Sequence, residues 1–162
     1  MRPTFKQRLL VNLQEAVESD LKNVLASANN AVAAATHAEN RPENKYDTRG
    51  LEASYLAGAQ NARAAELTAT LEVIKELAPR DFAPEDMISV TAVVELKCSG
   101  VTSFYFLLGV AAGYVLEVDG KLVRTLTPNA PVAAALMGKF MGEIIEVLVG
   151  GELKEYEIID VL

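Results

Sequence analysis

The side chains most capable of chemistry are gathered in one short stretch, HAENRPENKYDTRGLEASYL, which runs from His37 to Leu56. His37 is the only histidine of the 162 residues, and Cys98 is the only cysteine. These counts exclude an internal disulfide, a thiolate metal cluster and a metal site with two histidine ligands. A serine–histidine–aspartate triad would need His37 as its base, and we expect this residue to be a solvated side chain at a helix end instead.

The second half of the chain offers no catalytic constellation in its sequence. Cys98 follows a strand-like run, and only Lys97 adjoins it as a basic residue, so we expect an inert, small hydrophobic side chain. The aromatic run at residues 104–106 is typical of a sheet core and its flank. The sequence contains no glycine-rich phosphate loop and no dinucleotide fingerprint.

The composition excludes two further classes of protein. The formal net charge is −7, whereas a protein that binds duplex nucleic acid directly presents an excess of basic residues to the phosphates. Hydrophobic residues make up 51% of the chain, which is ample for a packed core. No window approaches the roughly 18 uninterrupted apolar residues of a membrane span. We therefore expect a soluble cytoplasmic protein that does not bind nucleic acid directly as its main activity.

Two long segments with helical periodicity flank the polar stretch. The first, residues 5–38, contains neither glycine nor proline, and its apolar residues step by threes and fours, as in the seam of a coiled coil. The second, residues 51–78, shows similar steps. The expected seam positions are Leu10, Leu13, Val17, Leu21, Val24, Ala28, Ala31 and Ala35 in the first segment, and Leu56, Ala59, Arg63, Leu67, Leu71, Ile74 and Leu77 in the second.

The sizes of these residues predict how the two helices pair. Large residues lie early in the first segment and late in the second, whereas alanines fill the remaining parts. An antiparallel hairpin matches large with large and small with small, with Leu10 near Leu77 and Ala28 near Ala59. A parallel dimer of separate helices would not explain this match. The sequence therefore predicts an antiparallel coiled-coil hairpin whose tip falls at about residues 39–50.

The polar stretch contains the residues expected at such a tip. Pro42 is expected to end the first helix, and Asp47 or Thr48 to cap the second. A capping box needs an acidic residue at the position of Leu51, but Glu52 comes one residue later. Carboxylates and amides are ordinary residues of a turn that faces water, so a capped, solvated loop is a sufficient explanation of the residue pattern alone.

The sequence pattern changes after residue 79. The segment APRDFAPED holds two prolines and separates the helical part, residues 1–79, from an α+β domain, residues 85–162. Asp119–Gly120 and Gly150–Gly151 predict tight hairpin turns. The predicted strands are residues 88–96, 103–108, 113–118, 121–126, 144–149 and 155–161, and one short helix has Asn129 as a possible N-cap, Pro131 near its first turn and Gly138 at its end.

The string TLTPNAPVAAALMGKFMGEIIEVLVGGELKEYEIIDV, Thr125 to Val161, resembles the C-terminal domain of the bacterial GreA/GreB transcription elongation factor family. That family also carries a long antiparallel helical hairpin with an acidic tip, so the resemblance covers nearly the whole chain in the right order. It implies an FKBP-like fold for the second domain. The matching residues are Pro128, Pro131, Leu136, Gly138, Lys139, Gly142, Glu143, Tyr156, Glu157 and Ile158.

The resemblance also implies a mechanism. Factors of this family insert the hairpin into the secondary channel of RNA polymerase, where tip carboxylates help to hold Mg²⁺ and stimulate cleavage of backtracked transcripts. The assisting residues here would be Asp47, Glu43 and Glu52, with Asp47 and Glu43 facing the metal. The protein would then be no enzyme itself and would bind no cofactor alone. It would share Mg²⁺ with the polymerase and contact RNA and DNA only indirectly.

The tip departs from the family pattern in one place. A cleavage-competent tip resembles Asp-x-x-Glu followed by Asn, but here Gly50 stands three residues after Asp47. Two alternatives therefore stay open. One is a regulator that binds the secondary channel without promoting cleavage, and the other is a coiled-coil adaptor whose FKBP-like domain binds peptide.

Overall fold

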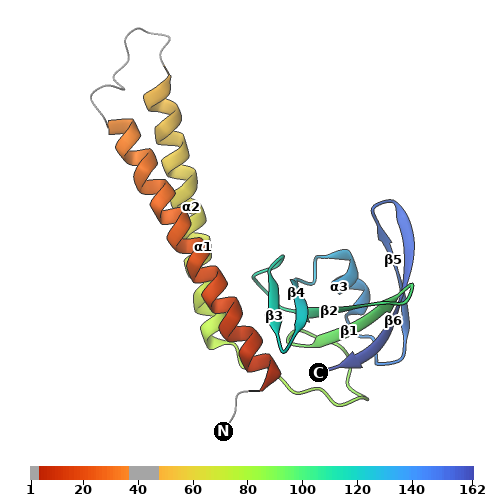
Figure 1. Ribbon diagram of the computed structural model, residues 1–162. Coiled ribbons are helices and arrows are strands. Elements are labelled where there is room, and N and C mark those ends of the chain that lie inside the picture. Colours follow the sequence, from red (N-terminus) through yellow and green to blue (C-terminus); the bar gives the residue numbers. More distant parts are fainter. Residues whose placement is uncertain (1–3, 37–47) are drawn as a thin grey trace. The chain divides into compact units, whose positions relative to one another are not determined.

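The computed structural model describes residues 4–36 and 48–162 (Figure 1). The chain forms two compact units: one is Gln14–Lys75, and the other joins Met1–Leu13 with Glu76–Leu162. The sequence predicts a single domain boundary, between residues 79 and 85. The structure instead groups the first thirteen residues with the second half of the chain. No helix in the part of the chain that the structure describes is long and apolar enough to cross a membrane.

The two long predicted helices are present as α1, Phe5–Thr36, and α2, Arg49–Glu76. Within the unit Gln14–Lys75 they lie side by side and run in opposite directions (Figure 1). A capping box that the sequence analysis missed begins α1. The Gln7 backbone N–H donates to Thr4 Oγ1 at 3.2 Å, and the Thr4 N–H donates to Gln7 Oε1 at 2.8 Å.

The buried residues of the helices correct part of the predicted seam. Small residues fill it where predicted in α1, since Ala28 and Ala31 are buried. In α2, however, Leu56 is 49% exposed and the neighbouring Ala57 is buried in its place. Further along α2, Arg63 is exposed. The seam of α2 therefore runs one residue later than predicted at its start, through Ala57, Ala64, Leu67, Leu71 and Ile74.

The second unit contains a mixed six-stranded sheet in the order β3-β4-β2-β1-β6-β5. Neighbouring strands are antiparallel except β2 and β4, which are parallel. This sheet and one short helix agree with the predicted α+β class, while the FKBP-like fold stays a prediction. The strands are β1 Val93–Cys98, β2 Val101–Leu107, β3 Val115–Val118, β4 Lys121–Leu126, β5 Ile144–Val149 and β6 Glu152–Val161.

Both predicted hairpin turns are present, and their backbone explains their residues. Asp119 and Gly120 have φ angles of 53° and 73° between β3 and β4. Gly150 and Gly151 have φ angles of 62° and 87° between β5 and β6. A pair of positive φ angles matches the twist of a two-residue hairpin, and glycine adopts them without a steric cost.

The first strand begins later than predicted. Ile88 was expected to start it, but β1 starts at Val93 because Thr91 has a φ of 76°, which breaks the extended backbone. Tertiary hydrogen bonds hold that conformation: the Thr91 N–H donates to the Leu107 carbonyl at 2.8 Å, and Thr91 Oγ1 accepts from the Arg80 N–H at 3.1 Å. Ile88 is still buried, as part of the core rather than of the sheet.

The short helix α3, Pro131–Leu136, packs against β5 and buries Ala133 and Leu136. Pro131 stands at the start of the helix as predicted. The predicted N-cap is wrong, because Ala130 occupies that position and no side chain caps the helix. The core beneath α3 joins residues of β1, β2, β5 and β6, including Leu96, Leu107, Ile145, Val147, Tyr156 and Ile158.

The first turns of α1 are anchored to the sheet-containing unit. Leu9 is completely buried, and Asn12 Nδ2 donates to the Glu117 carbonyl at 3.0 Å. Arg8 forms an ion pair with Asp119 in the β3–β4 turn. These contacts explain why the first thirteen residues belong to this unit.

Candidate functional site

The start of α2 is the only part of the predicted tip that lies among the described residues. The Glu52 N–H donates to the Thr48 carbonyl at 2.9 Å, and Thr48 Oγ1 donates to Glu52 Oε1 at 2.7 Å. Thr48 therefore precedes the helix as predicted, but its hydroxyl binds a carboxylate instead of a backbone N–H. The negative charge of Glu52 lies in the first turn of the helix, where the helix dipole favours it.

Glu52 thus has a local structural role and is also exposed to solvent. A carboxylate offers about four lone-pair sites, so the single bond from Thr48 leaves most of its acceptor capacity to another partner. Asp47 and Glu43, the two residues predicted to face a metal, lie outside the described residues. Within residues 4–36 and 48–162, no group of three histidine, cysteine, aspartate or glutamate residues could hold a metal ion. The metal assignment of Asp47 and Glu43 stays a prediction.

Large apolar side chains are exposed beside the start of α2. Leu51 is 55% exposed and Tyr55 is 69% exposed, four residues apart and hence on one face of the helix. This surface was not predicted, because the expected seam of α2 included Leu56. Clustered exposed apolar residues are typical of surfaces that contact another molecule. The sequence pattern that could have indicated it is an alternative seam through Ala57, which leaves the larger side chains on the exposed face of the helix.

The residues that carry the family resemblance in the second unit have structural roles. Gly142 has a φ of 85°, and its N–H donates to the Ile158 carbonyl at 2.8 Å. Glu143 accepts from the Phe140 N–H at 2.7 Å and from Lys139 Nζ at 3.3 Å. The Phe140 N–H first, and then Lys139, lower the pKa of the Glu143 carboxyl, so this carboxylate stays ionised and holds its turn.

These roles explain the string between α3 and β6 as a set of turns. The Gly138 N–H donates to the Ile88 carbonyl at 2.8 Å, and the Ile88 N–H donates to the Lys139 carbonyl at 2.8 Å, which ties the end of α3 to the segment before β1. The matching residues in this half therefore have roles in turns and in packing.

Comparison with known proteins finds similarity only to solved structures, and at low identity. No protein-family model and no curated protein matches the chain. Among solved structures, the chain is similar to the GreA factor homolog 1 (Gfh1) protein of Thermus thermophilus, at 16% identity, with 92% of this chain and 94% of that chain covered and a TM-score of 0.40.

Two further structures show the same level of similarity. Gfh1 of Thermus aquaticus is 18% identical, with 91% and 92% of the two chains covered and a TM-score of 0.40. The transcription elongation factor GreA/GreB from Nitrosomonas europaea is 22% identical, with 60% of this chain and 78% of that chain covered and a TM-score of 0.36. Scores this low do not establish a shared fold, so the function must be argued from the residues.

Proposed function

We propose that this protein is a transcription elongation factor that binds RNA polymerase. Its helical hairpin enters the secondary channel of the polymerase and stimulates cleavage of backtracked transcripts by the polymerase's own nuclease activity. The observation that carries the proposal is the order of parts along the chain. Two long helices joined by a carboxylate-rich segment precede a sheet unit in which the string from Thr125 to Val161 has the family's pattern.

The packing of the helices supports this use. Ala28 and Ala31 of α1 and Ala57 and Ala64 of α2 are buried. Alanines at a helix contact let the two backbones approach more closely than leucines do, so this part of the hairpin is slim. A slim pair of helices suits entry into a narrow passage.

The tip supplies carboxylates to a metal ion that belongs to the polymerase. Hard cations such as Mg²⁺ prefer carboxylate oxygens, and a Mg²⁺ shared with a phosphate can activate water and stabilise the leaving oxygen. Asp47 and Glu43 are assigned as the groups that face this metal. Glu52 is assigned a supporting role, because Thr48 already binds one of its oxygens.

A second candidate function is a channel-binding regulator that does not promote cleavage. Gly50 favours it, because this residue stands where a cleavage-competent tip of the family has a glutamate. The chain would then keep the hairpin and the sheet unit, but lack one of the paired carboxylates.

The two functions are distinguished by mixing the protein with a backtracked RNA polymerase complex and Mg²⁺, then measuring transcript length and co-purification in parallel. Binding with shortening supports cleavage stimulation, and binding without shortening supports the regulator. An absence of binding refutes both and leaves the coiled-coil adaptor.

Asp47→Ala tests the residue assignment in the same assay. We expect it to abolish shortening while changing the free energy of polymerase binding by less than about 1 kcal/mol, because it removes one carboxylate assigned to the metal and leaves the side chains of the helices and the sheet unit unchanged. The matched control is Glu72→Ala, which removes an exposed carboxylate near the C-terminal end of α2 and should leave both readouts unchanged. Undiminished shortening by Asp47→Ala would show that another group faces the metal.

A further inference from the structure

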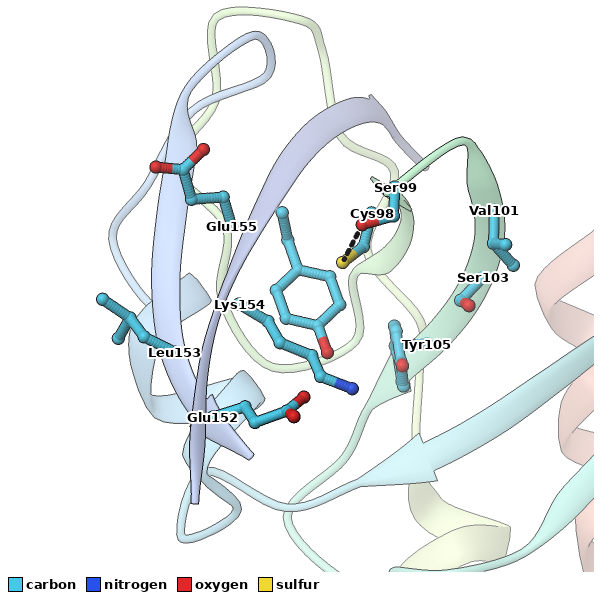
Figure 2. A pocket seen from close by; sticks show the side chains of 10 residues that line it. Cys98, Ser99, Val101, Ser103, Tyr105, Glu152, Leu153, Lys154 and Glu155 are labelled. Atoms are coloured by element: carbon cyan, nitrogen blue, oxygen red, sulfur yellow. Dashed lines mark hydrogen bonds between the residues drawn. The ribbon is translucent and has the colours of Figure 1, made fainter. Parts of the chain in front are cut away.

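The sheet unit contains a pocket of about 730 Å³ that is lined by residues of β1, β2 and β6 (Figure 2). This volume lies within the roughly 300–1,000 Å³ of sites that hold small molecules. The proposed function does not use this pocket, although Tyr156, one of its lining residues, is among those that match the family pattern. Its lining residues come from the β1–β2 hairpin and from the beginning of β6, and they include Cys98, Ser103, Tyr105, Glu152, Lys154 and Tyr156.

The alternation of β6 divides its side chains between the pocket and the opposite face. Figure 2 shows Glu152 and Lys154 extending toward the side of the pocket formed by β2, whereas Leu153 and Glu155 point away. The register agrees, since Leu153 faces Leu148 of β5 and both are 65% exposed on the outer surface. Lys154 and Glu152 thus bring one positive and one negative group into the same pocket. Within residues 4–36 and 48–162, neither forms an ion pair.

The pocket also contains two tyrosine hydroxyls that are open to solvent and have no protein partner among the described residues. Tyr156 is only 9% exposed, yet among the described residues its hydroxyl makes no hydrogen bond. The hydroxyl of Tyr105 makes none either within the same ranges. Burial, then Tyr105 and Cys98, raise the pKa of Tyr156, so its hydroxyl keeps its proton and stays a donor.

Because these hydroxyls are open to the pocket and unpaired within the described residues, each can donate a hydrogen bond to a molecule bound there. Ser103 adds another hydroxyl to the lining, on the same strand as Tyr105. The pocket therefore combines several neutral donors, one ammonium group and one carboxylate, which together recognise a molecule that carries both an anionic and a cationic group.

We propose that this pocket binds a small zwitterion of the amino-acid or short-peptide class. The carboxylate of the ligand accepts from Lys154 and from the hydroxyls of Tyr105 and Tyr156. The ammonium group of the ligand lies against Glu152. An anion alone would leave Glu152 unpaired beside it, and a cation alone would leave Lys154 unpaired. A zwitterion satisfies both groups.

Ligand-observed NMR on the full chain tests the proposal. The probes are an equimolar mixture of the twenty amino acids and the dipeptide glycylglycine, with acetate, inorganic phosphate and methylammonium as single-charge comparisons. We expect at least one zwitterionic probe to bind at least about tenfold more tightly than every single-charge probe, since an interaction with a charged partner is commonly worth that much. Equal binding of acetate or phosphate, or no binding of any zwitterion at millimolar concentration, would overturn the proposal.

Substitutions of pocket residues test whether the probe binds in this pocket. Lys154→Met and Glu152→Gln should each weaken binding of the strongest probe by about tenfold, and Tyr156→Phe should weaken it while leaving the unliganded fold intact. The matched control is Glu155→Gln, on the same strand but on the outward face, which should bind normally. Unchanged binding by all three pocket variants would place the ligand elsewhere and refute the assignment. The measurement contains no RNA polymerase, so its outcome does not depend on whether the proposed function is right.

Discussion

Lys6 gives the stability of the sheet-containing unit an unusual dependence on pH. Its side chain is only 5% exposed, its ammonium group donates to the Arg80 carbonyl, and it lies 4.6 Å from the centre of the Phe82 ring. Burial lowers the pKa of Lys6 from 10.5 to about 8, against an opposing effect of Asp81 and with a smaller lowering by Arg80. The folded protein therefore releases this proton more easily than the unfolded chain.

The sign of the effect follows from that difference. Between pH 8 and 10.5 the unfolded chain binds more protons at Lys6 than the folded chain, so the free energy of unfolding rises with pH in this window. The full difference in pKa corresponds to about 3 kcal/mol. The Arg80 carbonyl and the Phe82 ring replace part of the lost hydration of the ammonium group, so we expect a gain of about 1–2 kcal/mol.

Urea unfolding at pH 7, 8, 9 and 9.5 measures this gain when it is followed by methyl resonances of Leu136 and Ile158 in the sheet core. Lys6→Met keeps the length of the side chain and removes its charge, so its unfolding free energy should rise less with pH than that of the wild type. Lys22→Met, at an exposed site on α1, is the matched control and should keep the wild-type slope. Parallel slopes for the wild type and Lys6→Met would refute the reasoning.

Two further predictions concern packing and backbone. Leu136→Ala in α3 should destabilise the sheet unit by about 2–5 kcal/mol, because it empties a fully buried site, whereas the exposed Ala134→Gly should cost only about 1 kcal/mol in the same unfolding assay. Gly58→Ala in α2 should raise the thermal stability of the helical unit, since nothing lies within 4 Å of the added methyl group and alanine favours helix by about 1 kcal/mol. Gly142→Ala should instead lower stability by about 1 kcal/mol, because its φ of 85° disfavours a side chain; equal shifts for the two glycines would contradict this account.

The elements that local sequence determines were predicted well. Helical spacing over about thirty residues located α1 and α2, and the pairs Asp119–Gly120 and Gly150–Gly151 located both hairpin turns. The predictions are wrong where contacts with residues distant in the sequence determine which side chains are buried. The face of α2 that becomes buried depends on its partner helix, and the choice between Leu56 and Ala57 could not be made from spacing alone.

The candidate sites show the same division. The carboxylates of the tip could be proposed from the sequence because they lie in one short stretch of the chain, and their assignment stays a prediction; Glu52 is the one that the structure describes. The pocket was missed because its two tyrosines come from strands far apart in sequence, β2 and β6, which meet only through their common neighbour β1. The one signal available was a tyrosine at an inward position of each strand, Tyr105 and Tyr156, where a hydroxyl needs a partner.

The strand order gives β1 a special mechanical position. It is the single strand that joins the strand group β3-β4-β2 to the strand group β6-β5. The sheet can therefore separate at only two strand pairs, β1 with β2 and β1 with β6, without breaking either group. The pocket spans β1, and its lining residues come from β1 and from both strand groups. A molecule bound in the pocket would contact strands on both sides of β1. Because it would bind only the intact sheet, its concentration would determine how often the two strand groups separate.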